Sequence, residues 1–272
     1  MLKKVAAIHD LSGIGRCSLT VAIPILSALK VQCCPFPTAI LSSQTGFSEY
    51  SFLDLTNEMN KYKNVWNNLN IYFDCIYSGF LGSKDQVNIV SKFIDDNKDS
   101  LVIVDPVMGD DGDLYPIFDN EMCSKIKSLV QKSDIATPNL TEALILIGEN
   151  LNNTNLDKSN LVRIAKEVSN LGPSMVVITG IKIEDEIYNL SFDKNLDEAY
   201  FTSSHFNNVS YSGTGDIFTS ILVGMILNGH SLKNSVIKAN NFISNVISYT
   251  SKFDTDRNDG VMFEMFLNEL TN

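Results

Sequence analysis

The sequence predicts an α/β fold in which a mostly parallel central sheet carries helices on both faces. Short apolar runs rich in β-branched residues alternate with longer segments of helical periodicity, and such alternation builds βαβ units. Distinctive polar residues follow several of the apolar runs, and open sheets bind ligands beyond the carboxyl ends of their strands. No linker, composition shift or internal repeat divides the chain, so we expect one domain over residues 1–272.

The apolar runs predict the strands, and the periodic segments between them predict the helices. Pro35 and Pro37 restrict the second strand to an edge or a bent position, because proline has no N–H to donate to a neighbouring strand. Two segments that alternate in polarity, residues 186–192 and 198–202, predict an antiparallel pair. The remaining strands are expected at residues 4–8, 31–41, 74–78, 101–105, 134–137 and 175–179, and the helices at residues 16–29, 54–69, 83–97, 121–132, 140–147 and 156–171, from Asp216, from near Ser231 and at 263–270.

Composition and charge exclude several classes of protein. A net charge of −11 and a pI near 4.7 argue against non-specific binding to nucleic acid or to anionic membranes. No stretch approaches the roughly 20 apolar residues of a membrane span, and the first apolar run is too short for a signal peptide. Five scattered cysteines, at positions 17, 33, 34, 75 and 123, predict reduced and buried thiols. We therefore expect a cytoplasmic protein.

A glycine-rich turn near the end of the chain predicts an anion site. Gly213, Thr214 and Gly215 precede an apolar helix, and a helix start of this kind offers free N–H groups and a partial positive charge to phosphate. Asp216 lies inside this turn, where the helix terminus should lower the pKa of its carboxyl. An anion cradle with a carboxylate inside it suits a small-molecule kinase. The alternative is that Asp216 only caps the helix.

Two further motifs follow predicted strands. Asp105 comes directly after a buried strand, and the acidic, glycine-containing loop behind it, about residues 109–117, predicts a mobile lid. Carboxylate oxygens suit Mg²⁺, which accompanies ATP. Asn139 and Glu142 form a capping box at a helix start, and the same groups could also face a nucleotide and the water shell of a metal. The alternatives are a turn, a solvated loop and a cap without further function.

The loop after the first strand predicts a substrate site. Asp10 and Ser12 could hydrogen-bond a small polar ring, while the two glycines that follow make only half of a dinucleotide fingerprint. The loop that contains Thr45 could close over the same ligand. His9 has no metal-ligand companion at a suitable spacing, so we expect a structural hydrogen-bonding role for it. The chain lacks a Walker A loop, a His-Glu-x-x-His motif, a Gly-x-Ser-x-Gly elbow and a Cys-x-x-Cys pair.

The motifs at residues 105–109 (Asp-Pro-Val-Met-Gly), 137–142 (Thr-Pro-Asn-x-x-Glu) and 213–216 (Gly-Thr-Gly-Asp), in this order, resemble the ribokinase-like superfamily. Within it the chain resembles the vitamin B6 kinases, the pyridoxal/pyridoxamine kinases, from the first strand to the helix after Asp216. The resemblance implies a ribokinase-like three-layer sandwich and a homodimer. It also implies phosphorylation of the 5′-hydroxymethyl group of a B6 vitamer by ATP with Mg²⁺, and with K⁺ as a further cation, in pyridoxal phosphate salvage.

The resemblance also implies roles for individual residues. Asp216 matches the catalytic base, and the amides of Gly213, Thr214 and Gly215 match the anion hole for the transferred phosphoryl group. Asp10 and Thr45 match contacts to the substrate ring. Positions around ATP and its cations match Asp105, Tyr115, Thr137, Asn139, Glu142, Thr179, Thr214 and Gly215, with Asp105 and Glu142 on the metal side.

Two departures from the family pattern bear on the substrate. Better-known pyridoxal kinases often have serine at the position of Asp10, so an acid there favours the amine vitamer or a protonated ring nitrogen. Hydroxymethylpyrimidine kinases of thiamin synthesis typically have cysteine at the position of Asp216, which counts against that alternative. A non-catalytic vitamer-binding protein on the same fold is the alternative from another functional class.

Overall fold

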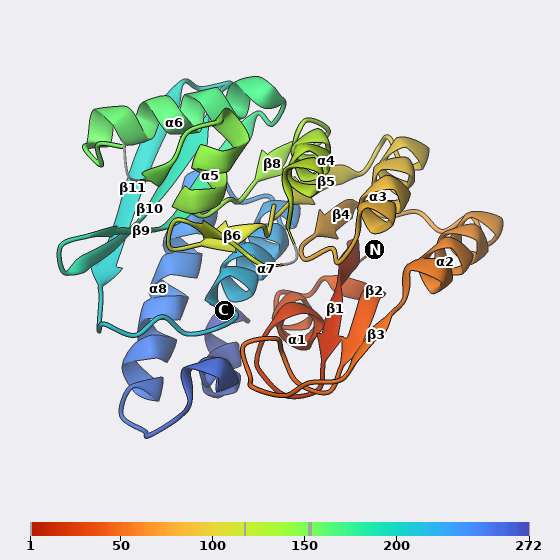
Figure 1. Cartoon of the computed structure of the whole chain (residues 1–272), viewed down its shortest axis with the longest axis horizontal. Helices are drawn as coiled ribbons and strands as arrows, with labels where there is room; N and C mark the ends of the chain where they lie inside the picture. Colours follow the sequence, from red (N-terminus) through yellow and green to blue (C-terminus); the bar gives the residue numbers. More distant parts are fainter. Residues whose placement is uncertain (1, 117, 152–153, 272) are drawn as a thin grey trace.

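A nine-stranded sheet runs through the computed structural model, which describes residues 2–116, 118–151 and 154–271 (Figure 1). The strand order is β11-β10-β9-β8-β5-β4-β1-β2-β3. The six strands from β9 to β2 are parallel, whereas β10, β11 and β3 pair antiparallel at the two ends, so the predicted sheet and antiparallel pair are confirmed. The strands are β1 Lys4–Ser12, β2 Gln32–Leu41, β3 Phe52–Asp54, β4 Cys75–Ser78, β5 Leu101–Val104, β8 Ile135–Ala136, β9 Met175–Ile183, β10 Glu186–Asp193 and β11 Glu198–His205.

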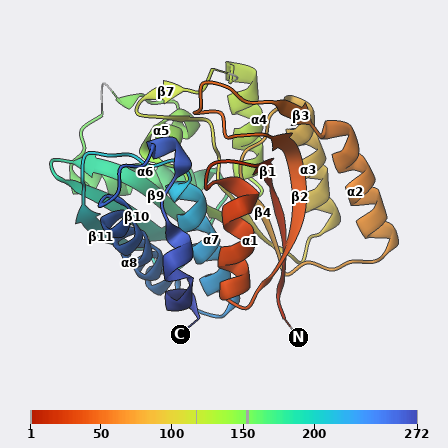
Figure 2. The ribbon, with the colours of Figure 1, turned by 90° about the horizontal axis from the view of Figure 1, so that it is seen from below.

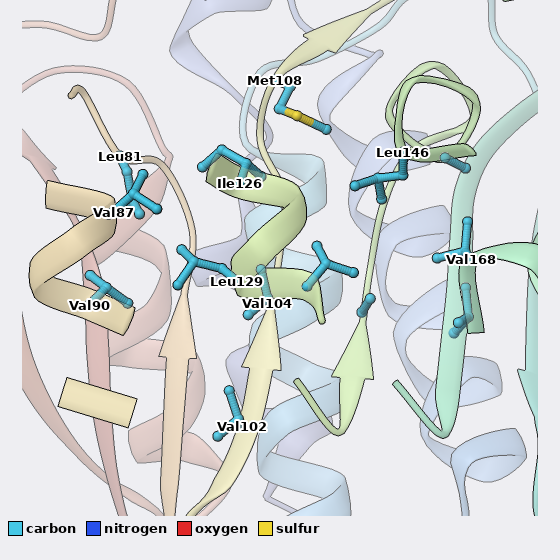
Figure 3. Packing of buried hydrophobic residues seen from close by; sticks show 14 of the residues in the cluster. Leu81, Val87, Val90, Val102, Val104, Met108, Ile126, Leu129, Leu146 and Val168 are labelled. Atoms are coloured by element: carbon cyan, nitrogen blue, oxygen red, sulfur yellow. The ribbon is translucent and has the colours of Figure 1, made fainter. Parts of the chain in front are cut away.

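Helices cover both faces of the sheet, as predicted, and each layer has its own core (Figures 1 and 2). One core lies between the sheet and α3 to α6, where Val104 of β5, Val90 of α3 and Leu129 of α4 are buried (Figure 3). The other lies beneath α1, α7 and α8. The helices are α1 Ser18–Ala28, α2 Thr56–Asn68, α3 Lys84–Asp96, α4 Asn120–Val130, α5 Leu140–Ile147, α6 Lys158–Leu171, α7 Thr214–Leu227 and α8 Leu232–Thr250, followed by 3₁₀ helices at Arg257–Asp259 and Phe263–Leu270.

The sequence predicted no membrane span and five reduced, buried cysteines, and the structure can be compared with both expectations. Among the described residues, no helix combines the length and the apolar character that crossing a membrane requires. All five cysteines are free thiols; Cys75 is buried, whereas the other four are only half-buried, so the expected full burial was wrong for them.

The prolines of β2 lie where one side of the strand is unpaired. Pro35 and Pro37 pair with β1 on one side, while the short β3 contacts only residues 39–41 on the other side. Within the described residues, no second strand therefore lies beside the two prolines, where an N–H donor would be needed. The predicted edge position is right for this half of β2 and wrong for its last residues, because no local pattern indicated β3.

The expected lid loop contains a small antiparallel hairpin, β6 (Gly109–Asp110) with β7 (Asp113–Leu114). Asp111 and Gly112 form its turn with φ values of 50° and 94°, the left-handed backbone that a two-residue turn requires. The hairpin lies against the start of α5, where the Gly112 N–H donates to Thr141 Oγ1 at 2.9 Å. Position 117, at the predicted end of the lid, lies outside the described residues.

Helix α7 begins on a turn that requires glycine. Gly213 has a φ of 77°, and a Cβ at this position would lie 1.8 Å from the carbonyl oxygen of Arg16. The start of α7 is therefore packed against the backbone of the loop after β1. At Gly215 a Cβ would meet nothing within 4 Å, and its φ is not in the left-handed region. The helix begins at Thr214, two residues before the predicted start.

We expect Gly213→Ala to destabilise the protein, because alanine there adds both left-handed strain of about 1–2 kcal/mol and a backbone collision. A loss of about 2 kcal/mol lowers the Tm by roughly 4–8 °C in a chain of this size. Gly215→Ala is the matched control and should change stability by less than about 0.5 kcal/mol. Thermal unfolding of both variants measures the difference, and equal Tm values would contradict this account of the turn.

Candidate active site

Polar side chains lie at the carboxyl edge of the sheet on the side that α7 covers. Ile103 and Ile135 belong to the core beneath α7, and side chains alternate between the two faces along a strand. Asp105 and Thr137, two positions further on, face the same way. Thr219 of α7 confirms this, because its Oγ1 lies 3.1 Å from Thr137 Oγ1 and 3.5 Å from Asp105 Oδ2. Two predicted strand ends and one position of α7 thus meet at one place.

Asp216 lies on the first turn of α7 and faces the loop after β1. Its Oδ2 accepts a hydrogen bond of 2.9 Å from the backbone N–H of Ser18, and its Oδ1 lies 3.8 Å from His9 Nδ1. The side chain is 17% exposed. Asp216 is therefore a nearly buried carboxylate with an opening to solvent, as a group that reacts with a bound substrate needs.

The predicted lowering of the Asp216 pKa was wrong. Burial raises the pKa of this carboxyl to about 7, and the negative charge of Asp10 acts in the same direction. The Ser18 N–H opposes both effects without overcoming them. The helix terminus favours the charged form, but loss of hydration in this position disfavours it more strongly. Asp216 is thus poised to exchange a proton near neutral pH.

Asp10, near the end of β1, accepts two buried hydrogen bonds. The Ser12 hydroxyl donates to its Oδ2 at 2.8 Å, and the Ser18 hydroxyl donates to its Oδ1 at 2.5 Å. Burial raises the Asp10 pKa, while these hydroxyls oppose the rise. Asp10, Ser12 and Asp216 are therefore brought together as predicted. No sequence pattern indicated a role for Ser18, which lies inside the predicted helix at residues 16–29.

A second group of acids lies beneath the lid hairpin. Glu142 accepts the backbone N–H of Asn139 at 2.8 Å and that of Met108 at 3.0 Å, and the predicted capping box of α5 is present. Burial raises the pKa of Glu142 to about 7. Burial also raises the pKa of Asp105 well above its usual range, and the charges of Glu142 and Asp216 add to this rise. Asp105 is thus close enough to Glu142 and to Asp216 for both charges to affect it.

These acids do not by themselves make a metal centre. Both oxygens of Glu142 accept backbone N–H groups, so its hydrogen bonds already hold it to the protein. In the described ranges, no cluster of three or more His, Cys, Asp or Glu side chains is arranged to hold a metal ion. Asp105 and Glu142 nevertheless are two neighbouring carboxyl groups at this edge of the sheet, which fits a hydrated cation that arrives with an anionic ligand.

The first turn of α7 fits a phosphate group. Among the described residues, no side chain caps its N–H groups, and the Thr214 hydroxyl donates instead to the Tyr211 carbonyl at 3.2 Å. The space around Gly215 is open, so a ligand can approach the backbone closely. These are the features that the glycine-rich turn predicted, with Asp216 one residue further on.

The remaining predicted residues lie at the border of the site. Thr179 follows the buried part of β9 and pairs with Asn139 as a parallel bridge. Tyr115 lies at the base of the lid, 39% exposed, where burial and the charge of Glu142 raise its pKa. Thr45 is exposed on its loop. That loop is fixed by Gln44, whose Nε2 donates to the carbonyl of Asn258 at 3.2 Å.

His9 does not have the expected hydrogen-bonding role. Neither ring nitrogen has a hydrogen-bond partner among the described residues, although the ring is fully buried. It packs edge-on against Tyr77 at 4.3 Å between centroids, and a Cβ at Gly79 would collide with it. Burial lowers the His9 pKa to about 3, so the imidazole beside Asp216 is neutral.

The known proteins that are similar to this chain are named either as pyridoxal kinases or as phosphomethylpyrimidine kinases. A Bacteroides thetaiotaomicron structure named as a phosphomethylpyrimidine kinase and crystallised with pyridoxal is 40% identical, with a TM-score of 0.95 over 100% of this chain and 96% of that one. Pyridoxal kinase from Lactobacillus plantarum is 27% identical, with a TM-score of 0.91 over 99% of this chain and 97% of that one. These similarities confirm the predicted ribokinase-like fold and the resemblance to B6 kinases.

A curated relative is named as a pyrimidine kinase. The hydroxymethylpyrimidine/phosphomethylpyrimidine kinase of Haemophilus influenzae is 29% identical over 176 residues, which are 63% of this chain and 64% of that protein. The chain thus spans just under two thirds of this relative's length. The model of the phosphomethylpyrimidine kinase family matches residues 23–261, and the chain therefore belongs to that family.

Proposed function

We propose that the protein, as one domain over residues 1–272, transfers a phosphoryl group from ATP to the 5′-hydroxymethyl group of a B6 vitamer: pyridoxal, pyridoxamine or pyridoxine. One observation carries this proposal: a nearly buried carboxylate, Asp216, with a pKa of about 7, lies on an uncapped and open helix start. A group that takes a proton from an alcohol and N–H groups that stabilise a phosphoryl anion are thereby adjacent. Family membership supports the same reaction class.

Asp216 is the proposed general base. As the hydroxyl oxygen of the acceptor forms a bond to the terminal phosphorus, the bond between that phosphorus and ADP breaks and the hydroxyl proton passes to Asp216. A base works best when its pKa lies near the working pH. The N–H groups at Gly213, Thr214 and Gly215 would stabilise the charge on the transferred group, because such transition states depend mainly on positioning and electrostatics.

Asp10, Ser12 and Thr45 are the proposed contacts to the acceptor ring, next to the base. On the nucleotide side, Mg²⁺ bound with ATP would neutralise phosphate charge, with Asp105 and Glu142 beside its water shell, and K⁺ is a possible further cation. The lid hairpin would exclude water from the transfer. The other residues proposed to face ATP are Tyr115, Thr137, Asn139, Thr179, Thr214 and Gly215.

Two observations favour a B6 vitamer over a pyrimidine. The 40% identical Bacteroides structure was crystallised with pyridoxal despite its name. Asp216 also stands where the resemblance places cysteine in hydroxymethylpyrimidine kinases. The family model and the Haemophilus relative keep hydroxymethylpyrimidine as the second candidate acceptor. A vitamer-binding protein without activity would not need a base beside an open anion site, so we propose an enzyme.

We expect turnover of ATP on at least one of pyridoxal, pyridoxamine and pyridoxine, assayed beside hydroxymethylpyrimidine with Mg²⁺ and K⁺. Asp216→Asn should lower kcat by about 10²–10⁴-fold, the scale of a positioned base, with little change in the KM for ATP. Asp99→Asn removes an exposed carboxylate far along the chain and serves as the charge-matched control. Activity on the pyrimidine only, or vitamer binding without turnover, would contradict the proposal.

The pH dependence of kcat/KM should show an acid limb with a midpoint near pH 7. Asp216 accepts a proton only when ionised, and burial raises its pKa to about 7. The rate should therefore fall as the pH falls through that value. A profile that stays flat down to pH 5 would show that the base titrates elsewhere.

Asp216→Asn should also raise the Tm at pH 8. A pKa of about 7 in the folded state, raised from an ordinary 3.8, means that the stabilising contribution of Asp216 is fully present below pH 3.8 and is lost as the pH rises through 7. Asparagine avoids the cost of a buried charge, so its advantage should shrink as the pH is lowered toward 5. Thermal unfolding against pH, with Asp99→Asn as control, measures this; a Tm advantage that grows toward low pH would contradict it.

A further inference from the structure

Ser18, the first residue of α1, contacts the carboxylates of Asp10 on β1 and Asp216 on α7 and belongs to neither predicted motif. Its backbone N–H donates to Asp216 Oδ2 at 2.9 Å, and its hydroxyl donates to Asp10 Oδ1 at 2.5 Å. In the described part of the chain, the Ser18 N–H is the one hydrogen bond that the Asp216 side chain receives. Ser18 thus joins the proposed base to the proposed ring contact.

The backbone of Ser18 is strained in the way that this double contact requires. Its φ is 51°, in the left-handed region that costs a residue other than glycine free energy, while Cys17 before it is extended. The φ angle sets the direction of Cβ relative to the N–H. At this φ, the N–H of Ser18 can donate to Asp216 of α7 while its hydroxyl donates to Asp10 of β1. Strain of this kind persists only where surrounding contacts hold it, and the hydroxyl bond to Asp10 is such a contact.

We propose that Ser18 is a positioning residue that holds Asp216 at a fixed distance from Asp10 and so aligns the base with the bound acceptor. This inference rests on the proposed function and adds a residue to it. Without the hydroxyl, nothing would pin Ser18 to Asp10, the strained backbone would relax, and the N–H would leave Asp216. Asp216 would then lose both its alignment with the acceptor and the N–H donor that favours its charged form.

Other groups around Asp216 do not replace this donor. His9 is neutral and 3.8 Å away, and the Asp10 charge disfavours ionisation of Asp216. The Ser18 N–H favours the ionised form of Asp216, so its loss should raise the pKa of this carboxyl. The titratable groups that face Asp216 are His9 and Asp10 of β1, Cys17 before α1, Tyr77 of β4, Asp105 after β5 and Tyr115 of the lid.

The test compares Ser18→Ala with Ser12→Ala, since each removes one hydroxyl from Asp10 but only Ser18 also contacts Asp216. We expect Ser18→Ala to lower kcat about tenfold and to move the acid limb up by about one pH unit, with the KM for ATP unchanged. Ser12→Ala should raise the KM for the acceptor, while its acid limb stays in place or moves down. Equal acid limbs in the two variants would overturn the proposal.

A carboxyl ¹³C NMR titration of Asp216 gives the same comparison without turnover. Its midpoint should rise by about one unit in Ser18→Ala and not in Ser12→Ala. Ser18→Cys, which keeps the side chain but weakens its donation to Asp10, provides a second variant if Ser18→Ala does not fold, and a rise in the midpoint is expected there too. An unchanged midpoint refutes the role of Ser18. A shifted midpoint in a protein that phosphorylates none of the four acceptors refutes the proposed function and leaves the Ser18 contact established.

Discussion

The contact between the start of α7 and the loop after β1 is the constraint on which the rest of the site depends. Gly213 meets the carbonyl of Arg16 so closely that any side chain would collide. The C-terminal segment contacts the same loop, because the Arg16 N–H donates to the Asp259 carbonyl at 3.1 Å. Backbone from three distant parts of the chain is fixed together, and Ser18 and Asp216 are brought within hydrogen-bonding distance as a result.

The site gathers four carboxyl groups that are largely removed from solvent. Asp10, Asp105, Glu142 and Asp216 all have raised pKa values, chiefly because of burial. Within the described residues, no lysine or arginine forms an ion pair with any of them. Uncompensated buried charge reduces stability, and natural proteins accept this reduction at functional sites. An anionic nucleotide would need helix N–H groups and a cation to bind here.

Elements that depend on local sequence were predicted well. The alternation of apolar runs and periodic segments specified the parallel sheet and its helices, and the Asn139–Glu142 capping box is a pattern within four residues. Elements that depend on a distant partner were missed. Strand β3 has three exposed residues and exists because β2 offers an edge beside it. The left-handed Ser18 is held by contacts with β1 and α7 that no local pattern encodes.

The sequence by itself determined which chemical groups follow which strands: the carboxylate of Asp105, the cap at Asn139 and the glycine-rich turn before Asp216. Only the tertiary structure decided the ionisation and pairing of these groups. Ser18 and Asp216 are 198 residues apart in the chain, and the pKa of Asp216 is raised where its helix position alone predicted a fall. The physical reason is that hydration and charge–charge distance depend on what packs around a side chain, whereas capping and chain turns depend on its immediate neighbours.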